Sequence, residues 1–150
     1  MTDKRPSSTA WIMVHIAFPL CPFFIEGAIR FIVFDDSLSL NTFSSSTLAV
    51  SVGLLCLFVS QCLFSYKTIL PNDEELESVI GAAHIFSIFA IVCFVVFGIL
   101  VLLSALSQKG ISIDVSNIKN TFDTLILIGG IIPIISSFYA QKSFKLRATI

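Results

Sequence analysis

The first long apolar stretch, residues 11–34, places the strongest constraint on how this chain can fold. It reads WIMVHIAFPLCPFFIEGAIRFIVF. At about 1.5 Å per residue, a helix of this length crosses the roughly 30 Å hydrocarbon core of a bilayer. The stretch also holds two prolines, Pro19 and Pro22, and two charges, Glu26 and Arg30. Charged side chains are costly inside a membrane, so this pair is a candidate functional feature.

The composition of the whole chain agrees with insertion into a membrane. Of the 150 residues, 55% are hydrophobic and only 13% are charged, whereas a soluble domain carries about a quarter charged residues. The mean hydropathy is +0.94. One small core cannot bury this much apolar surface, so lipid must cover the remainder. The net charge of −1 offers no basic surface for direct binding of nucleic acid.

Further apolar stretches predict an all-α fold, an integral membrane four-helix bundle that forms a single domain over residues 1–150. The expected spans are approximately residues 11–34, 43–64, 79–106 and 122–140. We expect the first and fourth spans to be kinked, because proline removes a backbone donor and crowds the preceding turn. The prolines concerned are Pro19, Pro22 and Pro133.

Small residues in the second span predict a close helix contact. Ala49 and Gly53 are four residues apart and would let another helix approach closely. In the third span, Phe86, Phe89 and Phe97 fall near one helical face, which favours helix packing over a ligand site.

The distribution of Lys and Arg predicts the orientation in a cell inner membrane. With four spans, both termini share one side of the bilayer. The basic residues that fall on that side are Lys4, Arg5, Lys67, Lys142, Lys145 and Arg147. Lys109 and Lys119 fall on the other side. The interfacial aromatics Trp11, Tyr66 and Tyr139 are also expected at the side of the termini. By the positive-inside rule, both termini are expected in the cytoplasm.

The charged pair in the first span allows two interpretations. Glu26 precedes Arg30 by four residues, which is the favoured order for an ion pair on a helix. The pair could line a pore or proton path, or sense the outer leaflet. Alternatively, the two charges neutralise each other and Arg30 snorkels to the outer headgroups.

Two charged clusters are expected on the cytoplasmic side. The third helix should begin with Asn72 as its N-cap, followed by the acidic residues Asp73, Glu74, Glu75 and Glu77. This acidic cap is either a solvated helix start or a docking strip for a basic cytoplasmic protein. The basic tail after the fourth span consists of Lys142, Lys145 and Arg147. It either anchors the chain to headgroups or contributes to partner binding.

Several absences argue against an enzyme and against any cofactor. The chain has no Ser-His-Asp order, HExxH, phosphate-binding glycine loop or CxxC. His15 and His84 lack a nearby Cys or carboxylate at ligand spacing, so no metal site is expected. Polar contact between helices is the expected role of each histidine, with proton sensing as the alternative. All four cysteines lie in apolar runs, so we expect no disulfides.

Three hypotheses about function follow from this layout. The first is a membrane subunit of a bacterial defence or signalling complex, which forms homo-oligomers and holds a cytoplasmic partner. The second is an immunity protein against a pore-forming or membrane-acting toxin. The third is a small oligomeric channel, for which no ring of charge stands at mid-membrane.

As a whole, the chain resembles the small four-span membrane subunit of the Kiwa anti-phage system. The shared features are Lys4 and Arg5 ahead of a proline-broken first span, short loops and no catalytic motif. The resemblance implies a homotetramer in the inner membrane. It also implies that the protein detects phage-induced membrane disturbance and works with a cytoplasmic DNA-binding effector subunit.

Overall fold

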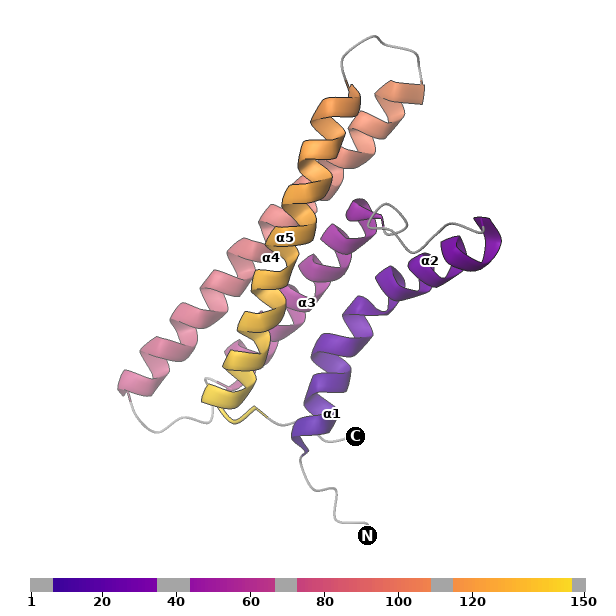
Figure 1. Ribbon diagram of the computed structural model, residues 1–150. Helices are drawn as coiled ribbons and strands as arrows, with labels where there is room; N and C mark the ends of the chain where they lie inside the picture. Colours follow the sequence, from indigo (N-terminus) through magenta and orange to yellow (C-terminus); the bar gives the residue numbers. More distant parts are fainter. Residues whose placement is uncertain (1–6, 35–43, 67–72, 109–114, 147–150) are drawn as a thin grey trace.

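The computed structural model describes residues 7–34, 44–66, 73–108 and 115–146, and these residues fold into an all-helical bundle (Figure 1). The elements are α1 (Ser8–Ile12), the π-helix η1 (Met13–Ala17), α2 (Phe18–Phe34), α3 (Ser45–Tyr66), α4 (Asp73–Gln108) and α5 (Val115–Ser143). Within the described residues, four helical segments are long and apolar enough to cross a membrane: Ser8–Val33, Ser45–Ser65, Leu76–Leu106 and Asp123–Ser143. The predicted fold class is therefore confirmed as all-α, with four helices long and apolar enough to span a membrane.

The first span is one run of helix that changes its hydrogen bonding near its start. The π-helical turn Met13–Ala17 lies between α1 and α2, directly before Pro19. Pro19 cannot donate a backbone bond to the residue four positions earlier, and a wider turn accommodates such a break. The irregularity thus lies about one turn before the position predicted from the prolines. The kinks themselves, including the one at Pro133 inside α5, stay predictions.

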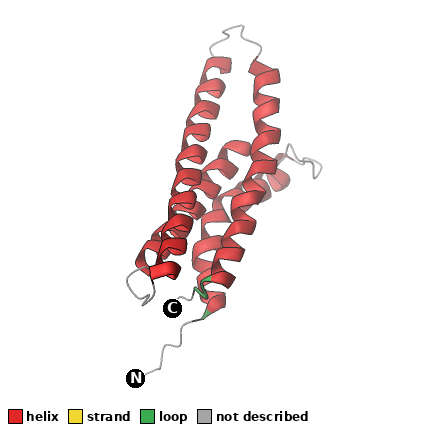
Figure 2. Cartoon of the chain, turned by 90° about the vertical axis from the view of Figure 1, so that its left-hand side faces the viewer, coloured by secondary structure: helices red, strands yellow, loops and turns green. Residues whose placement is uncertain are grey.

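Helix α3 forms the centre of the bundle (Figures 1 and 2). It contacts α2, α4 and α5, and 56% of its span is buried, against 17% to 22% for the other three. The close α3–α4 contact predicted at Gly53 is confirmed, because a Cβ there would lie 3.2 Å from Cys93 Cβ. Gly130 of α5 makes a similar approach, with a Cβ expected 3.4 Å from Val52 of α3.

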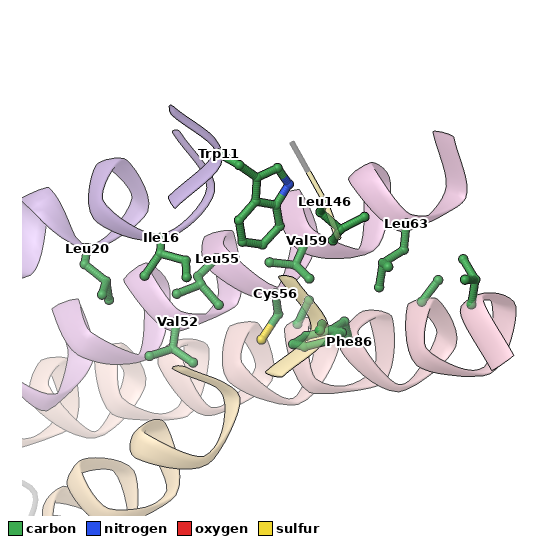
Figure 3. Close-up of a cluster of buried hydrophobic side chains, with 14 of the residues drawn as sticks. Trp11, Ile16, Leu20, Val52, Leu55, Cys56, Val59, Leu63, Phe86 and Leu146 are labelled. Atoms are coloured by element: carbon green, nitrogen blue, oxygen red, sulfur yellow. The ribbon is translucent and has the colours of Figure 1, made fainter. Parts of the chain in front are cut away.

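The core runs along α3 and ends beneath the start of α1 (Figure 3). Its fully buried members include Trp11, Leu55, Val59 and Leu63. Trp11 Nε1 donates to Cys62 Sγ at 3.1 Å. The burial of Trp11 corrects the expectation that it faces the lipid headgroups. Tyr139 is 68% exposed as an interfacial residue would be, and the side chain of Tyr66 lies outside the described residues.

The end of α5 turns back into this core through a Schellman-type C-cap. Lys145 adopts a left-handed conformation with φ of 50°, and Leu146 N–H donates to Gln141 O at 3.0 Å. This six-to-one bond is the signature of the motif. The turn places the Leu146 side chain, 1% exposed, in the cluster that contains Trp11 (Figure 3). As a result, α1 begins and α5 ends at the same end of the bundle (Figure 1).

Candidate functional site

The charged pair on α2 forms a one-sided ion pair. Arg30 Nη2 donates to Glu26 Oε1 at 2.7 Å, and Arg30 Nε donates to the same oxygen at 3.0 Å. The other oxygen, Oε2, is shielded, and no described residue donates to it. The side chains are 42% and 27% exposed for Arg30 and Glu26. The pair therefore neutralises most of its charge within one helix, yet one carboxylate oxygen stays without a donor.

The half of α2 that carries this pair makes few contacts with the rest of the molecule. Within residues 21–33, Gly27 is the single buried residue. The apolar side chains exposed here include Phe24, Ile25, Ile29, Phe31, Ile32 and Val33. In Figure 1 this half of α2 runs away from α4 and α5. Lipid or another protein must therefore cover it, since exposed apolar surface of this extent is unfavourable in water.

The prolines occupy different environments. Pro19 is fully buried, and Pro22 inside α2 is exposed. Pro133 is fully buried inside α5. The Ser137 hydroxyl donates to the Pro133 carbonyl oxygen at 2.7 Å, so the buried serine is hydrogen-bonded within its own helix.

The two charged clusters lie at the other end of the bundle from the exposed half of α2. Helix α4 begins at Asp73, as the sequence predicted, and its start lies near the end of α5 (Figure 1). Glu77, Lys142 and Lys145 are exposed. The predicted residues whose side chains lie outside the described part are Asp73, Glu74, Glu75 and Arg147. The structure therefore does not bring the ion pair together with either cluster.

Serine hydroxyls of α3 make polar contacts with the neighbouring helices, as expected for small hydroxyls in this span. The Ser45 hydroxyl at the start of α3 donates to Asp123 Oδ1 of α5. Deeper in the bundle, the Ser60 hydroxyl bonds to Ala83 O at 2.9 Å and lies 2.7 Å from Ser87 Oγ, which links α3 to α4. Asp123 is a charged residue near an apolar stretch, and that signal alone could have identified it.

The histidines differ from the expected contacts between helices. His15 Nδ1 lies 3.0 Å from Trp11 O, and its ring stacks on the Trp11 ring at 4.7 Å. His84 Nδ1 lies 2.8 Å from Ile80 O, within its own helix. The described ring contact of His84 with another helix is a T-shaped one with Phe64 of α3, with the ring centroids 5.5 Å apart. Each histidine is therefore hydrogen-bonded mainly to its own helix.

Among the described residues, no three His, Cys, Asp or Glu side chains gather closely enough to hold a metal ion. The four cysteines are free thiols: Cys21, Cys56, Cys62 and Cys93.

Comparison of the chain with protein-family models, with curated proteins and with solved structures finds no match.

Proposed function

We propose that this protein is an oligomeric inner-membrane subunit of a bacterial anti-phage defence complex. In this proposal it senses disturbance of the bilayer and recruits a cytoplasmic effector protein. The observation that carries the proposal is the ion pair of Glu26 and Arg30 on a half-helix that makes few contacts with the bundle. The resemblance to the Kiwa membrane subunit supports the defence role, and with it a homotetramer.

A charged pair on a loosely packed helix is suited to respond to the state of the membrane. The exposed half of α2 gains little from contacts within the chain, so its position depends on the lipid around it. Thinning or wetting of the outer leaflet changes the cost of keeping Glu26 and Arg30 at their depth. The kinks proposed at Pro19 and Pro22 would let this half of the first span move separately from its start.

The bundle offers a path from this half-helix to the cytoplasmic side. Helix α3 packs against α2 and α4. Helix α4 begins at Asp73, just before its membrane span starts at Leu76. We propose that a displacement of α2 shifts α4 through α3. The acidic cap Asp73, Glu74, Glu75 and Glu77, together with the basic tail Lys142, Lys145 and Arg147, would then present an altered docking surface. Charge complementarity would select the partner.

The two other hypotheses remain as outcomes of the tests. A channel would require several copies, because large side chains such as Trp11 and Leu55 fill the core of one copy. An immunity protein would protect against its toxin without a cytoplasmic partner.

The first test is a mild-detergent pull-down of the tagged chain from its native host, followed by intact mass measurement. The expected result is a homo-oligomer with a stoichiometric cytoplasmic protein. A homo-oligomer without such a partner would contradict the defence-complex proposal. Ion flux in liposomes would then favour a channel, and its absence would favour an immunity protein.

The second test removes the charged pair. Glu26→Gln with Arg30→Gln should abolish phage resistance in cells while the oligomer assembles normally. The matched control is the exchanged pair, Glu26→Arg with Arg30→Glu, which keeps an ion pair on the same helix and should retain resistance. Normal resistance in the uncharged double variant would rule out the sensor role of the pair.

A further inference from the structure

A groove with a polar end lies between the first span and α3, away from the ion pair. Its volume is about 440 Å³, and it is open on one side. The described residues that line it are Val14, His15, Phe18, Phe58, Gln61, Cys62 and Ser65. All of them belong to membrane-spanning segments, and Val14, Phe18 and Gln61 are exposed. The groove is therefore open to the bilayer from the side.

The hydrogen-bonding side chains and the two phenylalanines of the groove lie at different depths. Along the first span His15 precedes Phe18, and along α3 Phe58 precedes Gln61 and Ser65. Since α1 begins and α3 ends at the same end of the bundle (Figure 1), the hydrogen-bonding groups lie near that end and both phenylalanines lie deeper. At 1.5 Å per residue, Gln61 is about 6 Å from the end of its span. Because the 21-residue span is about as long as the hydrocarbon core is thick, Gln61 lies about one helical turn below the boundary with the headgroups, toward which its long side chain can extend.

Two polar side chains in the groove have hydrogen-bonding capacity left over. When His15 Nδ1–H donates to Trp11 O, Nε2 is left as an acceptor. The Gln61 side-chain amide bonds to no described residue, although its backbone oxygen accepts from Ser65 at 2.9 Å. A polar amide that faces lipid without a partner is unfavourable. The groove thus presents an acceptor at His15 and both donors and an acceptor at Gln61.

We propose that this groove binds a phospholipid molecule. The Gln61 amide donates to an ester carbonyl oxygen, and His15 Nε2 accepts from a donor in the headgroup. The acyl chain lies between Phe18 and Phe58. No charged residue is among the described residues that line the groove, so the selected headgroup is one with N–H or O–H donors. Ethanolamine and glycerol headgroups both supply such donors, and a choline headgroup supplies none.

The single tryptophan of the chain makes the proposal directly testable. Trp11 is fully buried and stacks on His15, which lines the groove, so lipid in the groove lies one side chain away from it. The purified protein is reconstituted in phosphatidylcholine vesicles that contain a small fraction of brominated phosphatidylethanolamine, phosphatidylglycerol or phosphatidylcholine. Bromine quenches tryptophan fluorescence at short range, so lipid held in the groove should quench Trp11 more strongly than lipid farther away. We expect ethanolamine or glycerol lipid to quench about fivefold more efficiently than choline lipid at equal fraction, as one net hydrogen bond implies.

Variants test whether the preference for ethanolamine or glycerol lipid over choline lipid arises in the groove. His15→Phe should remove most of the headgroup preference, because it removes the acceptor for the headgroup donor and keeps an aromatic ring beside Trp11. Gln61→Leu should lower the quenching by all three lipids alike, because the ester carbonyl that its amide binds is common to them. His84→Phe, on the exposed surface of α4 and outside the groove, is the matched control and should retain the headgroup preference. Circular dichroism checks that each variant is folded, and His15→Leu replaces His15→Phe where the latter is not folded.

The outcomes separate clearly. Stronger quenching by ethanolamine lipid or by glycerol lipid identifies which headgroup occupies the groove. Equal quenching by all three lipids in the unmodified protein would overturn the proposal. So would a headgroup preference that survives His15→Phe, or one that His84→Phe abolishes.

Discussion

Glu26 and Arg30 stabilise each other's charge within the first span. Replacing Glu26 by Gln leaves the Arg30 guanidinium without a counter-charge on a helix that faces lipid. We expect Glu26→Gln to destabilise the fold by about 1–2 kcal/mol, because an unpaired charge near the bilayer is costly. The double variant Glu26→Gln, Arg30→Gln should recover most of this loss. Unfolding by SDS in mixed micelles measures both. A double variant that is no more stable than Glu26→Gln would contradict this pairing of the two charges.

Leu146 carries a second prediction about a single residue. The Schellman-type turn at Lys145 buries Leu146 against the cluster that contains Trp11. Leu146→Ala should therefore destabilise the fold by about 2–3 kcal/mol through a cavity. Leu125→Ala, at a side chain that is 63% exposed, should have a much smaller effect. The same SDS titration compares the two variants, and equal losses would contradict the packing role of the tail.

Helix α3 depends on close approach at Gly53, and this dependence gives a prediction about packing between elements. A Cβ at Gly53 would meet Cys93 Cβ at 3.2 Å and Phe94 Cζ at 3.3 Å, whereas one at Gly98 would meet nothing within 4 Å. Gly53→Ala should destabilise by about 1 kcal/mol and Gly53→Leu by about 3 kcal/mol. Gly98→Ala should instead stabilise by about 0.5 kcal/mol through helix propensity. Opposite signs in thermal or SDS unfolding would support the α3–α4 contact, and equal signs would contradict it.

The elements themselves were predictable from the sequence, because a segment that crosses lipid must be long, apolar and helical. The helix start at Asp73 and the contact at Gly53 followed from local chemistry. The central position of α3 was not predictable, since lipid and protein interiors are equally apolar and hydropathy does not distinguish them. The burial of Trp11 and the return of Leu146 arise from tertiary packing. The bond between Ser45 and Asp123 joins residues distant in the sequence, which no local pattern reveals.

In the whole molecule, the two kinds of polar feature lie at opposite ends of the span. The Glu26–Arg30 pair lies on the half of α2 remote from the termini, whereas the groove with His15 and Gln61 lies near them (Figure 1). Between them, the core around Leu55 is mostly apolar, with the buried serines Ser51 and Ser60 on the same helix. The signal that we propose between the two ends would therefore travel through helix displacement.

The orientation of the whole molecule gives the last prediction. Helix α1 begins and α5 ends at the same end of the bundle, and the exposed Lys142 and Lys145 belong to or directly follow the last turn of α5. Because the positive-inside rule places such residues in the cytoplasm, green fluorescent protein fused after Ile150 should fluoresce and alkaline phosphatase there should be inactive. Fusions that replace everything after Gln108 should give the reverse result, since they follow an odd number of spans. An active phosphatase after Ile150 would show that the molecule has the opposite orientation in the membrane. The ion pair would then face the cytoplasm, and sensing of the outer leaflet by α2 would be excluded.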